Sequence, residues 1–343
     1  DFAEFDGKTL INLDTEEYGE IYVSSAGGAR TETKFITEVR KIGNEYTPVS
    51  IEVKGLSGGH SGAEIHKNLG NSVKILSEVL YHLSKRYEIL LSHIDGGGKV
   101  NAIPREAIAE IAVKLDGDSI DEFKKLAGLA FENIIHDFKV SDKSPILMVE
   151  KIDSKNKEKT FSGISLGDTL NIISFLHEFP NGVLQMSRHI EGLVKTSINL
   201  GVINTEIVDG NAKIKIKSLA RSMTNASLDK LLEEITELTR KHDANIKIAS
   251  SNPPWEYKEN SEIRELIVKS FKELTGKDPV IKAIHAGLEC GIFTENIKNA
   301  DVVSIGPNIY GAHTPEERMD IKSVGETWEW ILKILENYNI KEE

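Results

Sequence analysis

An acidic residue at the end of an apolar run is the first feature of this sequence that could do chemistry. Leu10, Ile11 and Leu13 form a short apolar run that ends in Asp14, and α/β enzymes commonly place reactive groups at the carboxyl end of a buried strand. A hydrolytic metal site needs several ligands that converge from different elements. Only thirteen residues precede Asp14, so we expect that the chain lacks an amino-terminal part that supplies the other ligands.

A second candidate metal ligand lies near the other end of the sequence. His313 stands in residues 306–318, a loop rich in glycine and proline that follows an apolar run. An imidazole at the carboxyl end of a strand can reach a metal ion, and glycines allow the backbone to come close to it. The alternative is a surface loop whose histidine caps the final helix.

Two further glycine-rich loops could act on a substrate. Residues 54–62 surround His60 with small residues, and such a loop can direct an imidazole and backbone N–H groups toward a developing oxyanion. On spacing alone, a turn with Ser61 as a helix N-cap is the simpler interpretation. Residues 96–104 place Asn101 between two predicted strands, where a flexible hairpin loop is the plain alternative.

The turn at residues 285–291, which contains Gly287, follows a predicted strand and could open a helix. Free N–H groups at a helix start attract carboxylates, so this turn is a candidate anchor for the carboxylate of a substrate. The pair Glu16 and Glu17 could act in acid–base catalysis. Solvated side chains that follow the strand explain this pair more simply.

Hydrophobic periodicity predicts the elements that must position these residues. The block from Val49 to Phe138 reads strand, helix, strand, strand, helix, and a second pass from Pro145 to Ser250 repeats this order and adds a strand. The second pass is predicted to begin with a strand near Ile146. Each pass would form one ferredoxin-like half of an α+β region.

A third block follows the proline pair Pro253 and Pro254, which should stop the preceding strand. Helices and strands alternate again in this block, and that alternation predicts a mainly parallel, helix-covered sheet. The strand before Asp14 would join this sheet. The long middle region would then be an insertion in an α/β domain.

Composition narrows the classes of function. A chain of 343 residues favours two domains. The net charge of -12, without a basic stripe, argues against a nucleic-acid partner. No apolar run approaches the roughly 18 residues of a membrane span. The single cysteine, Cys290, excludes an internal disulfide and fits a reducing, cytoplasmic compartment.

Five stretches together resemble a known family of enzymes. They are residues 10–20 (LINLDTEEYGE), 54–66 (KGLSGGHSGAEIH), 101–106 (NAIPRE), 285–291 (HAGLECG) and 304–318 (SIGPNIYGAHTPEER). In this order they resemble the aminoacyl-histidine (Xaa-His, carnosinase-like) dipeptidases of the zinc aminoacylase and dipeptidase superfamily. The resemblance implies an α/β catalytic domain with two zinc ions, interrupted by a lid. The catalytic domain would comprise residues 1–32 and 253–343, and the lid 33–252.

The resemblance also implies roles for single residues. Asp14 and His313 correspond to zinc ligands, although such ligands also accept manganese or cobalt. His60 corresponds to the lid imidazole that stabilises the oxyanion, Asn101 and Arg221 to lid groups that orient the substrate and its carboxylate, and Gly287 to the pocket wall. The family's other ligands and its catalytic glutamate pair lie before Asp14. We therefore expect a dipeptidase whose chain, as written here, is inactive alone.

Partners and competing functions follow from the same resemblance. The substrate would be a small peptide, and a doubled lid can imitate a dimer within one chain, so that His60 acts in cis. A homodimer is compatible with this arrangement but not required. The alternatives are another metallo-dipeptidase, a tripeptidase, an aminoacylase, or a non-catalytic scaffold that retains the fold.

Overall fold

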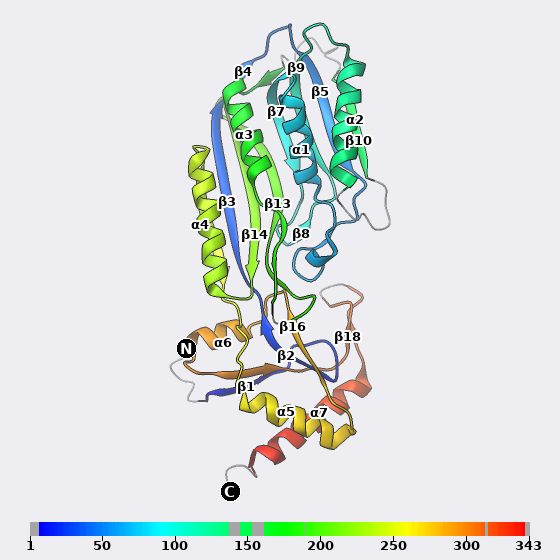
Figure 1. The fold of residues 1–343 in the computed structure, drawn as a ribbon, viewed down its shortest axis with the longest axis vertical. Coiled ribbons are helices and arrows are strands. Elements are labelled where there is room, and N and C mark those ends of the chain that lie inside the picture. The colour runs from blue at the N-terminus through cyan, green and yellow to red at the C-terminus, as the bar shows by residue number, and fades with distance from the viewer. Residues whose placement is uncertain (1–6, 137–144, 153–160, 189, 313–314, 340–343) are drawn as a thin grey trace. The chain divides into compact units, whose positions relative to one another are not determined.

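Two compact units make up the computed structural model, which describes residues 7–136, 145–152, 161–188, 190–312 and 315–339 (Figure 1). The inserted unit comprises residues 29–221 and 226–251, and the split unit comprises residues up to Gly28, 222–225 and 252 onward. The predicted boundary between residues 32 and 33 lies inside the strand β3 (Gly27–Glu38), whereas the units divide between Gly28 and Ala29.

The first half of the inserted unit has the strand–helix–strand–strand–helix–strand order of a ferredoxin-like sandwich. Its strands lie in the order β10-β5-β9-β7, and each neighbouring pair is antiparallel. The elements are β5 (Thr47–Lys54), α1 (Ser72–Ser84), β7 (Glu88–Gly96), β9 (Ala107–Lys114), α2 (Ile120–His136) and β10 (Ile146–Lys151).

The second half has the same order but begins earlier in the chain than predicted. The strand near Ile146 is the fourth strand of the first half, because it pairs with β5. The first strand of the second half is β3, so the whole first half is inserted between β3 and the first helix of the second half. The elements are β3, α3 (Leu166–Glu178), β13 (Val194–Val208), β14 (Asn211–Ser222), α4 (Asn225–Lys241) and β15 (Asn245–Asn252), with strand order β13-β14-β3-β15.

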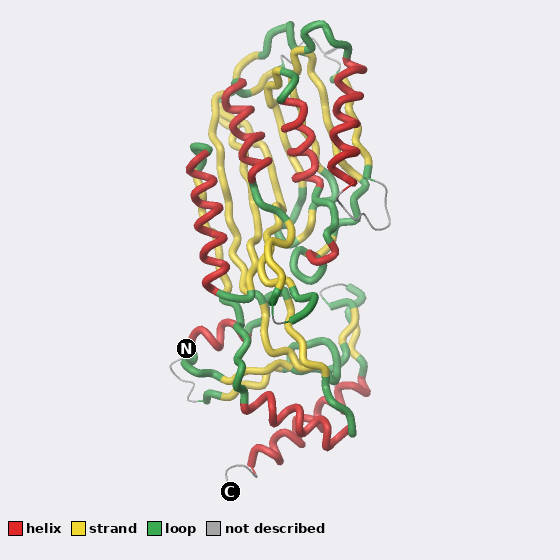
Figure 2. Tube along the Cα trace, in the orientation of Figure 1, coloured by secondary structure: helices red, strands yellow, loops and turns green. Residues whose placement is uncertain are grey.

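Pairing of β7 with β13 joins the two halves into one sheet, which β12 (Gly182–Met186) extends beside β13. The hydroxyl of Thr205 accepts a hydrogen bond from Ile94 N at 3.0 Å and donates one to Ile94 O at 2.9 Å. One hydrophobic core contains residues from all four helices, including Leu76, Phe123 and Phe175. The helices therefore cover one face of a continuous sheet (Figures 1 and 2).

The split unit contains a four-stranded sheet in the order β1 (Thr9–Asn12), β17 (Asp301–Ser304), β2 (Glu20–Ser25) and β16 (Val280–Ile284). The two outer pairings are parallel and the central one is antiparallel, so the sheet is mixed. Helices α5 (Glu262–Thr275) and α7 (Ile321–Asn339) pack on one face around Trp330, and α6 (Cys290–Asn296) contributes Cys290 to a second cluster with Trp255.

Short pairings complete the described structure. They are β4 (Arg40–Lys41) with β11 (Ser162–Gly163), β18 (Ile309–Tyr310) with β19 (Arg318–Met319), and β6 (Gly59–His60) with β8 (Ala102–Ile103). Among the described residues, no helix combines the length and apolar character that a membrane crossing requires.

Candidate active site

The pairing of β6 with β8 brings two of the predicted glycine-rich loops together. His60 lies opposite Ala102 in this short ladder, and Ser61 N donates to Asn101 O at 3.0 Å. Residues 97–101 form a turn that leads into β8, with Ala102 N bonded to Lys99 O at 3.1 Å. Two residues about forty positions apart in the sequence, His60 and Asn101, thus share one local structure.

Two backbone amides hold the imidazole of His60. Its Nδ1 accepts hydrogen bonds from Gly62 N at 3.2 Å and from Ala63 N at 3.0 Å. A ring nitrogen that accepts from N–H groups carries no proton, so this network assigns the proton of the neutral ring to Nε2. His60 is therefore set up as a hydrogen-bond donor through Nε2.

The segment after His60 does not begin a helix, so the interpretation of Ser61 as an N-cap is wrong. The helix α1 starts at Ser72, and Asn71 caps it by accepting from Lys74 N at 3.1 Å. Residues 61–64 instead form a tight turn that leads into the 3-10 helix Ile65–Lys67. This turn supplies the amides that His60 needs.

Glu64 fixes the backbone of His60 from the other side. Its carboxylate accepts from His60 N at 2.8 Å and pairs with Lys67 Nζ at 2.7 Å. The hydrogen bond from Lys67, followed by that from His60 N, lowers the pKa of Glu64 below its ordinary value. Sequence reasoning missed Glu64, although its position four residues after His60 was a signal that could have been used.

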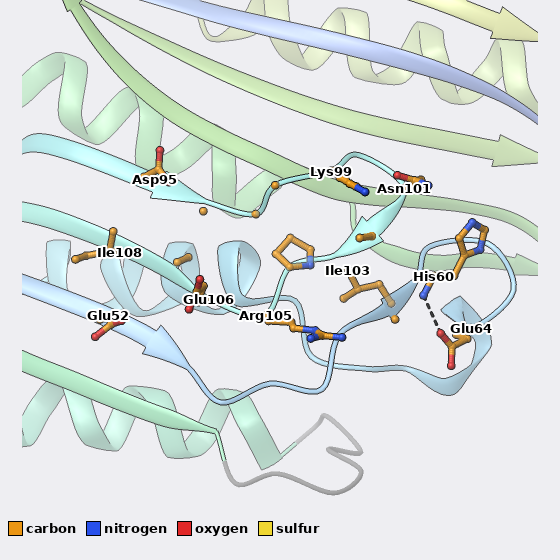
Figure 3. A pocket seen from close by; sticks show the side chains of 17 residues that line it. Glu52, His60, Glu64, Asp95, Lys99, Asn101, Ile103, Arg105, Glu106 and Ile108 are labelled. Atoms are coloured by element: carbon orange, nitrogen blue, oxygen red, sulfur yellow. Dashed lines mark hydrogen bonds between the residues drawn. The ribbon is translucent and has the colours of Figure 1, made fainter. Parts of the chain in front are cut away.

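His60 and Asn101 line one end of a cavity of about 850 Å³ in the inserted unit, a size usual for small-ligand sites. Figure 3 shows both residues at this end, with Lys99 and Arg105 nearby. Glu52 and Asp95 lie on the sheet at the opposite end (Figure 3). The loop end thus carries both hydrogen-bond donors and the carboxylate of Glu64, and the sheet end carries further carboxylates.

Arg221 lies near the end of β14 and does not line this cavity. Its side chain is deeply buried, and its Nε finds no hydrogen-bond partner among the residues that the structure describes. Burial, and then the neighbouring guanidinium of Arg30, lower the pKa of Arg221 to about 10. A buried cation with an unused N–H group is a receptor suited to a carboxylate.

In the split unit, the segment around Asp14 lies against the start of the loop of residues 306–318, which the sequence predicts to carry the second metal ligand, His313. Backbone hydrogen bonds join the two segments. The strands β1 and β17 are parallel neighbours, and Ile305 N donates to Asn12 O at 3.0 Å. A Cβ added to Gly306 would lie 1.7 Å from Thr15 O, so the two backbones are in direct contact there. His313 itself lies outside the described residues.

Asp14 is exposed, and its own N–H group donates to Asn12 Oδ1 at 3.0 Å. Glu16 and Glu17 are exposed as well, as their simpler interpretation expects. Within the ranges that the structure covers, no three residues of His, Cys, Asp or Glu gather as a metal-binding group. Asp14 and His313 therefore stay predictions as metal ligands.

Gly287 is exposed, whereas His285 at the start of the same turn is buried, and the turn leads into α6, the helix that the sequence predicted there. Glu289 occupies the N-cap position, and its carboxylate accepts from Asn12 Nδ2. A carboxylate of the protein thus already lies at this helix start. A Cβ added to Gly287 would meet only Ala26 O, at 3.9 Å, so there is space beside this position, and its place in the pocket wall stays a prediction.

The chain is similar in sequence and in fold to known dipeptidases. A family model described as a peptidase dimerisation domain matches residues 51–134. The cytosol non-specific dipeptidase of Escherichia coli strain K12 is 35% identical over 332 residues, which cover 97% of this chain and 66% of that protein. The crystal structure of aminoacylhistidine dipeptidase from Vibrio alginolyticus is 30% identical with a TM-score of 0.86, again covering 97% of this chain and 66% of that one. The chain thus spans about two thirds of the length of both relatives.

Proposed function

Since the chain belongs to the M20 peptidase family, we propose that it serves the metal-dependent hydrolysis of dipeptides, with Xaa-His dipeptides as the preferred class. The matches confirm the family resemblance and the fold class expected from the sequence. The observation that carries the proposal for this chain is the imidazole of His60, whose Nδ1 is held by two amides so that Nε2 can donate.

We assign the inserted unit to the lid and the split unit to the catalytic domain. In this assignment His60 donates from Nε2 to the peptide carbonyl oxygen as it gains negative charge, where a preorganised donor contributes most. Asn101 orients the substrate from the same loop pair. Arg221 binds the substrate's carboxylate through its buried guanidinium, and Gly287 belongs to the wall of the pocket.

Asp14 and His313 are the residues of this chain that we propose as metal ligands. A carboxylate and an imidazole suit zinc, and they also suit manganese or cobalt. The bonded pair of loops after β1 and β17 fits this proposal, because it holds the Asp14 segment against residues 305–309. Such a metal supplies Lewis acidity toward the peptide carbonyl. The other ligands, and the second zinc site, would come from residues beyond these two.

The names of the two relatives differ in substrate, so a broad dipeptidase is the second candidate. The Escherichia coli relative is named a non-specific dipeptidase and the Vibrio alginolyticus relative an aminoacylhistidine dipeptidase. The former name also supports a cytosolic location for this protein. The two candidates share one site and differ only in how a substrate side chain is selected.

A substrate panel on the zinc-loaded, full-length protein tests the proposal. The panel contains β-alanyl-histidine, alanyl-histidine, alanyl-leucine, a tripeptide and an N-acetyl amino acid. We expect kcat/KM to be highest for the histidine dipeptides and to vanish with a chelator. Equal values for alanyl-leucine would support the broad dipeptidase, and hydrolysis of only the last two would indicate a tripeptidase or aminoacylase. If none of these substrates is hydrolysed, the result would support the alternative of a non-catalytic scaffold.

A further inference from the structure

The side chain of Asn199 brackets Asn101 with two hydrogen bonds. Asn199 lies on β13, in the second half of the inserted unit, and is 1% exposed. Its Nδ2 donates to Val100 O at 2.9 Å and to Ala102 O at 2.8 Å. Both N–H groups of this amide are thus used on the two carbonyls that flank Asn101.

A second buried amide anchors the strand β13 next to Asn199. Asn71 Nδ2 lies 3.4 Å from Asn199 Oδ1, and it also donates to Leu200 O and to Asn181 Oδ1 at 3.0 Å. Because Asn71 is also the N-cap of α1, this network connects the sheet of the second half to a helix of the first. Asn199 therefore has little freedom to follow the turn if the turn moves.

The backbones of β13 and the turn are in contact beside Asn199. A Cβ added to Gly201 would lie 2.6 Å from Val100 Cα. Gly97 has a φ of +70°, and a Cβ there would lie 2.0 Å from Gly201 O. No side chain fits between these segments, so β13 acts as a wall against which the turn is held.

We propose that Asn199 is a positioning residue that holds the side chain of Asn101 in place for dipeptide hydrolysis. The inference rests on the proposed function of Asn101. It explains what the second half of the doubled lid contributes, because β13 supports the loops of the first half from within the same chain. The hydrogen bonds of the Asn199 side chain within the described part of the chain go to two backbone carbonyls and to the amide of Asn71.

A double-mutant cycle with Asn199→Ala and Asn101→Ala tests this on the zinc-loaded, full-length protein with alanyl-histidine. Misplacing a substrate-orienting group by about 1 Å can cost roughly a hundredfold, so we expect N199A alone to lower kcat/KM by about tenfold to a hundredfold. In the N101A background the same change should cost much less, because residues that act as a unit are not additive. An equal loss in both backgrounds, or no loss in the wild-type background, would overturn the inference.

Asn171→Ala is the matched control. Asn171 also uses its amide within the inserted unit, donating to His242 O at 2.8 Å and pairing with the His242 ring at 2.8 Å. We expect N171A to lower the free energy of unfolding while leaving kcat/KM within about twofold, since nothing in the cavity depends on it. A decrease in kcat/KM for N171A equal to that for N199A would reduce Asn199 to a structural role.

Two results separate this inference from the proposed function. If N101A leaves kcat/KM unchanged, the proposed role of Asn101 fails, and the inference fails with it. If N101A lowers kcat/KM and N199A does not, only the inference fails. Should N199A not fold, Gly201→Ala presses on the same turn from the same strand; it should lower kcat/KM and show the same coupling to N101A, and an uncoupled or absent effect would contradict the inference.

Discussion

Two backbone amides determine which ring nitrogen of His60 can donate a hydrogen bond. Because Gly62 N and Ala63 N donate to Nδ1, the neutral ring offers a donor at Nε2 and no acceptor. The same ring could not serve as a general base through Nδ1 without losing both bonds. The hydrogen bonds at Nδ1 therefore favour a role of His60 in stabilising an oxyanion over a role in proton abstraction.

Replacement of His60 by alanine should remove this donor. Deletion of one preorganised oxyanion donor costs about 3 to 4 kcal/mol of barrier, so kcat of the full-length protein should fall about a hundredfold or more. Zinc content, measured by mass spectrometry, should not change. His66→Ala, an exposed histidine on the adjacent 3-10 helix, is the control and should keep wild-type kcat. Wild-type turnover in H60A would remove His60 from the mechanism.

Glu64 adds a pH-dependent contribution to the same loop. Its pKa is lowered in the folded state, chiefly by Lys67 and then by His60 N. A carboxylate with a lowered folded pKa stabilises the fold above its ordinary pKa of 4.5, and this contribution is lost as the pH falls through the folded pKa.

Glu64→Gln should therefore lower the free energy of unfolding near neutral pH, and its difference from the wild type should shrink as the pH falls through the folded pKa of Glu64. Urea unfolding of the two proteins at neutral pH and at a series of acidic pH values measures the difference. A gap between them that stays constant with pH would show that the charge of Glu64 is not involved.

At the scale of elements, the ends of β1 and β17 place the Asp14 segment against residues 305–309. Gly306 permits this contact, because any side chain there would collide with Thr15 O. Gly306→Ala should push the two loops apart and weaken zinc binding to the full-length protein by about tenfold or more, as losses next to metal ligands commonly do. Competition with a chromophoric chelator measures the affinity.

Gly325→Ala is the control for that substitution. Gly325 lies within α7, and a Cβ there meets nothing within 4 Å. Alanine is favoured over glycine in a helix interior by about 1 kcal/mol, so this variant should be more stable and should bind zinc as the wild type does. Equal zinc affinity in G306A and G325A would argue against the loop contact as a support of the metal site.

Periodicity predicts most helices and strands but not how the strands pair. The helical spacing of apolar residues that include Val73, Leu76 and Leu83 predicts α1. The structure buries all three side chains. The prediction places the strand at Ile146 in the wrong half, since alternation shows that a strand exists but not which neighbour it takes. The partner, β5, is determined by contacts between residues about a hundred positions apart in the sequence.

The candidate site is predictable only where side-chain type indicates a function. His60 and Asn101 stand in glycine-rich loops, and the sequence points to both. Asn199 lies between Ile198 and Leu200 in β13 and gives no signal, because its proposed role comes from the two carbonyls that the fold brings to it. The sequence after His60 resembles a helix start, because serine is a common N-cap residue. No helix begins at Ser61, however, and α1 starts only at Ser72.

At the scale of the whole molecule, the doubled lid bears on how many chains form one site. The β7 and β13 strands pair within a single chain, and β13 supports the Asn101 turn from the second half. The family model that matches the first half is nevertheless described as a dimerisation domain. The intrachain pairing favours the expectation, drawn from the family resemblance, that His60 acts in cis.

Mixing two inactive full-length variants distinguishes cis from trans action. If His60 served the site of a partner chain, co-refolding His60→Ala with Asp14→Asn would restore about a quarter of wild-type activity, because half of the dimers would contain one intact site. We expect no restoration. Light scattering of the wild type provides the accompanying measurement of oligomeric state.

The lone Cys290 gives the split unit a built-in reporter. It is fully buried, and burial, followed by Glu289, raises its pKa to about 12. Since no other thiol exists in the chain, a maleimide dye can attach only when the surroundings of α6 open. The rate of labelling would then measure how often the surroundings of Cys290 open, without a signal from any other thiol of this chain.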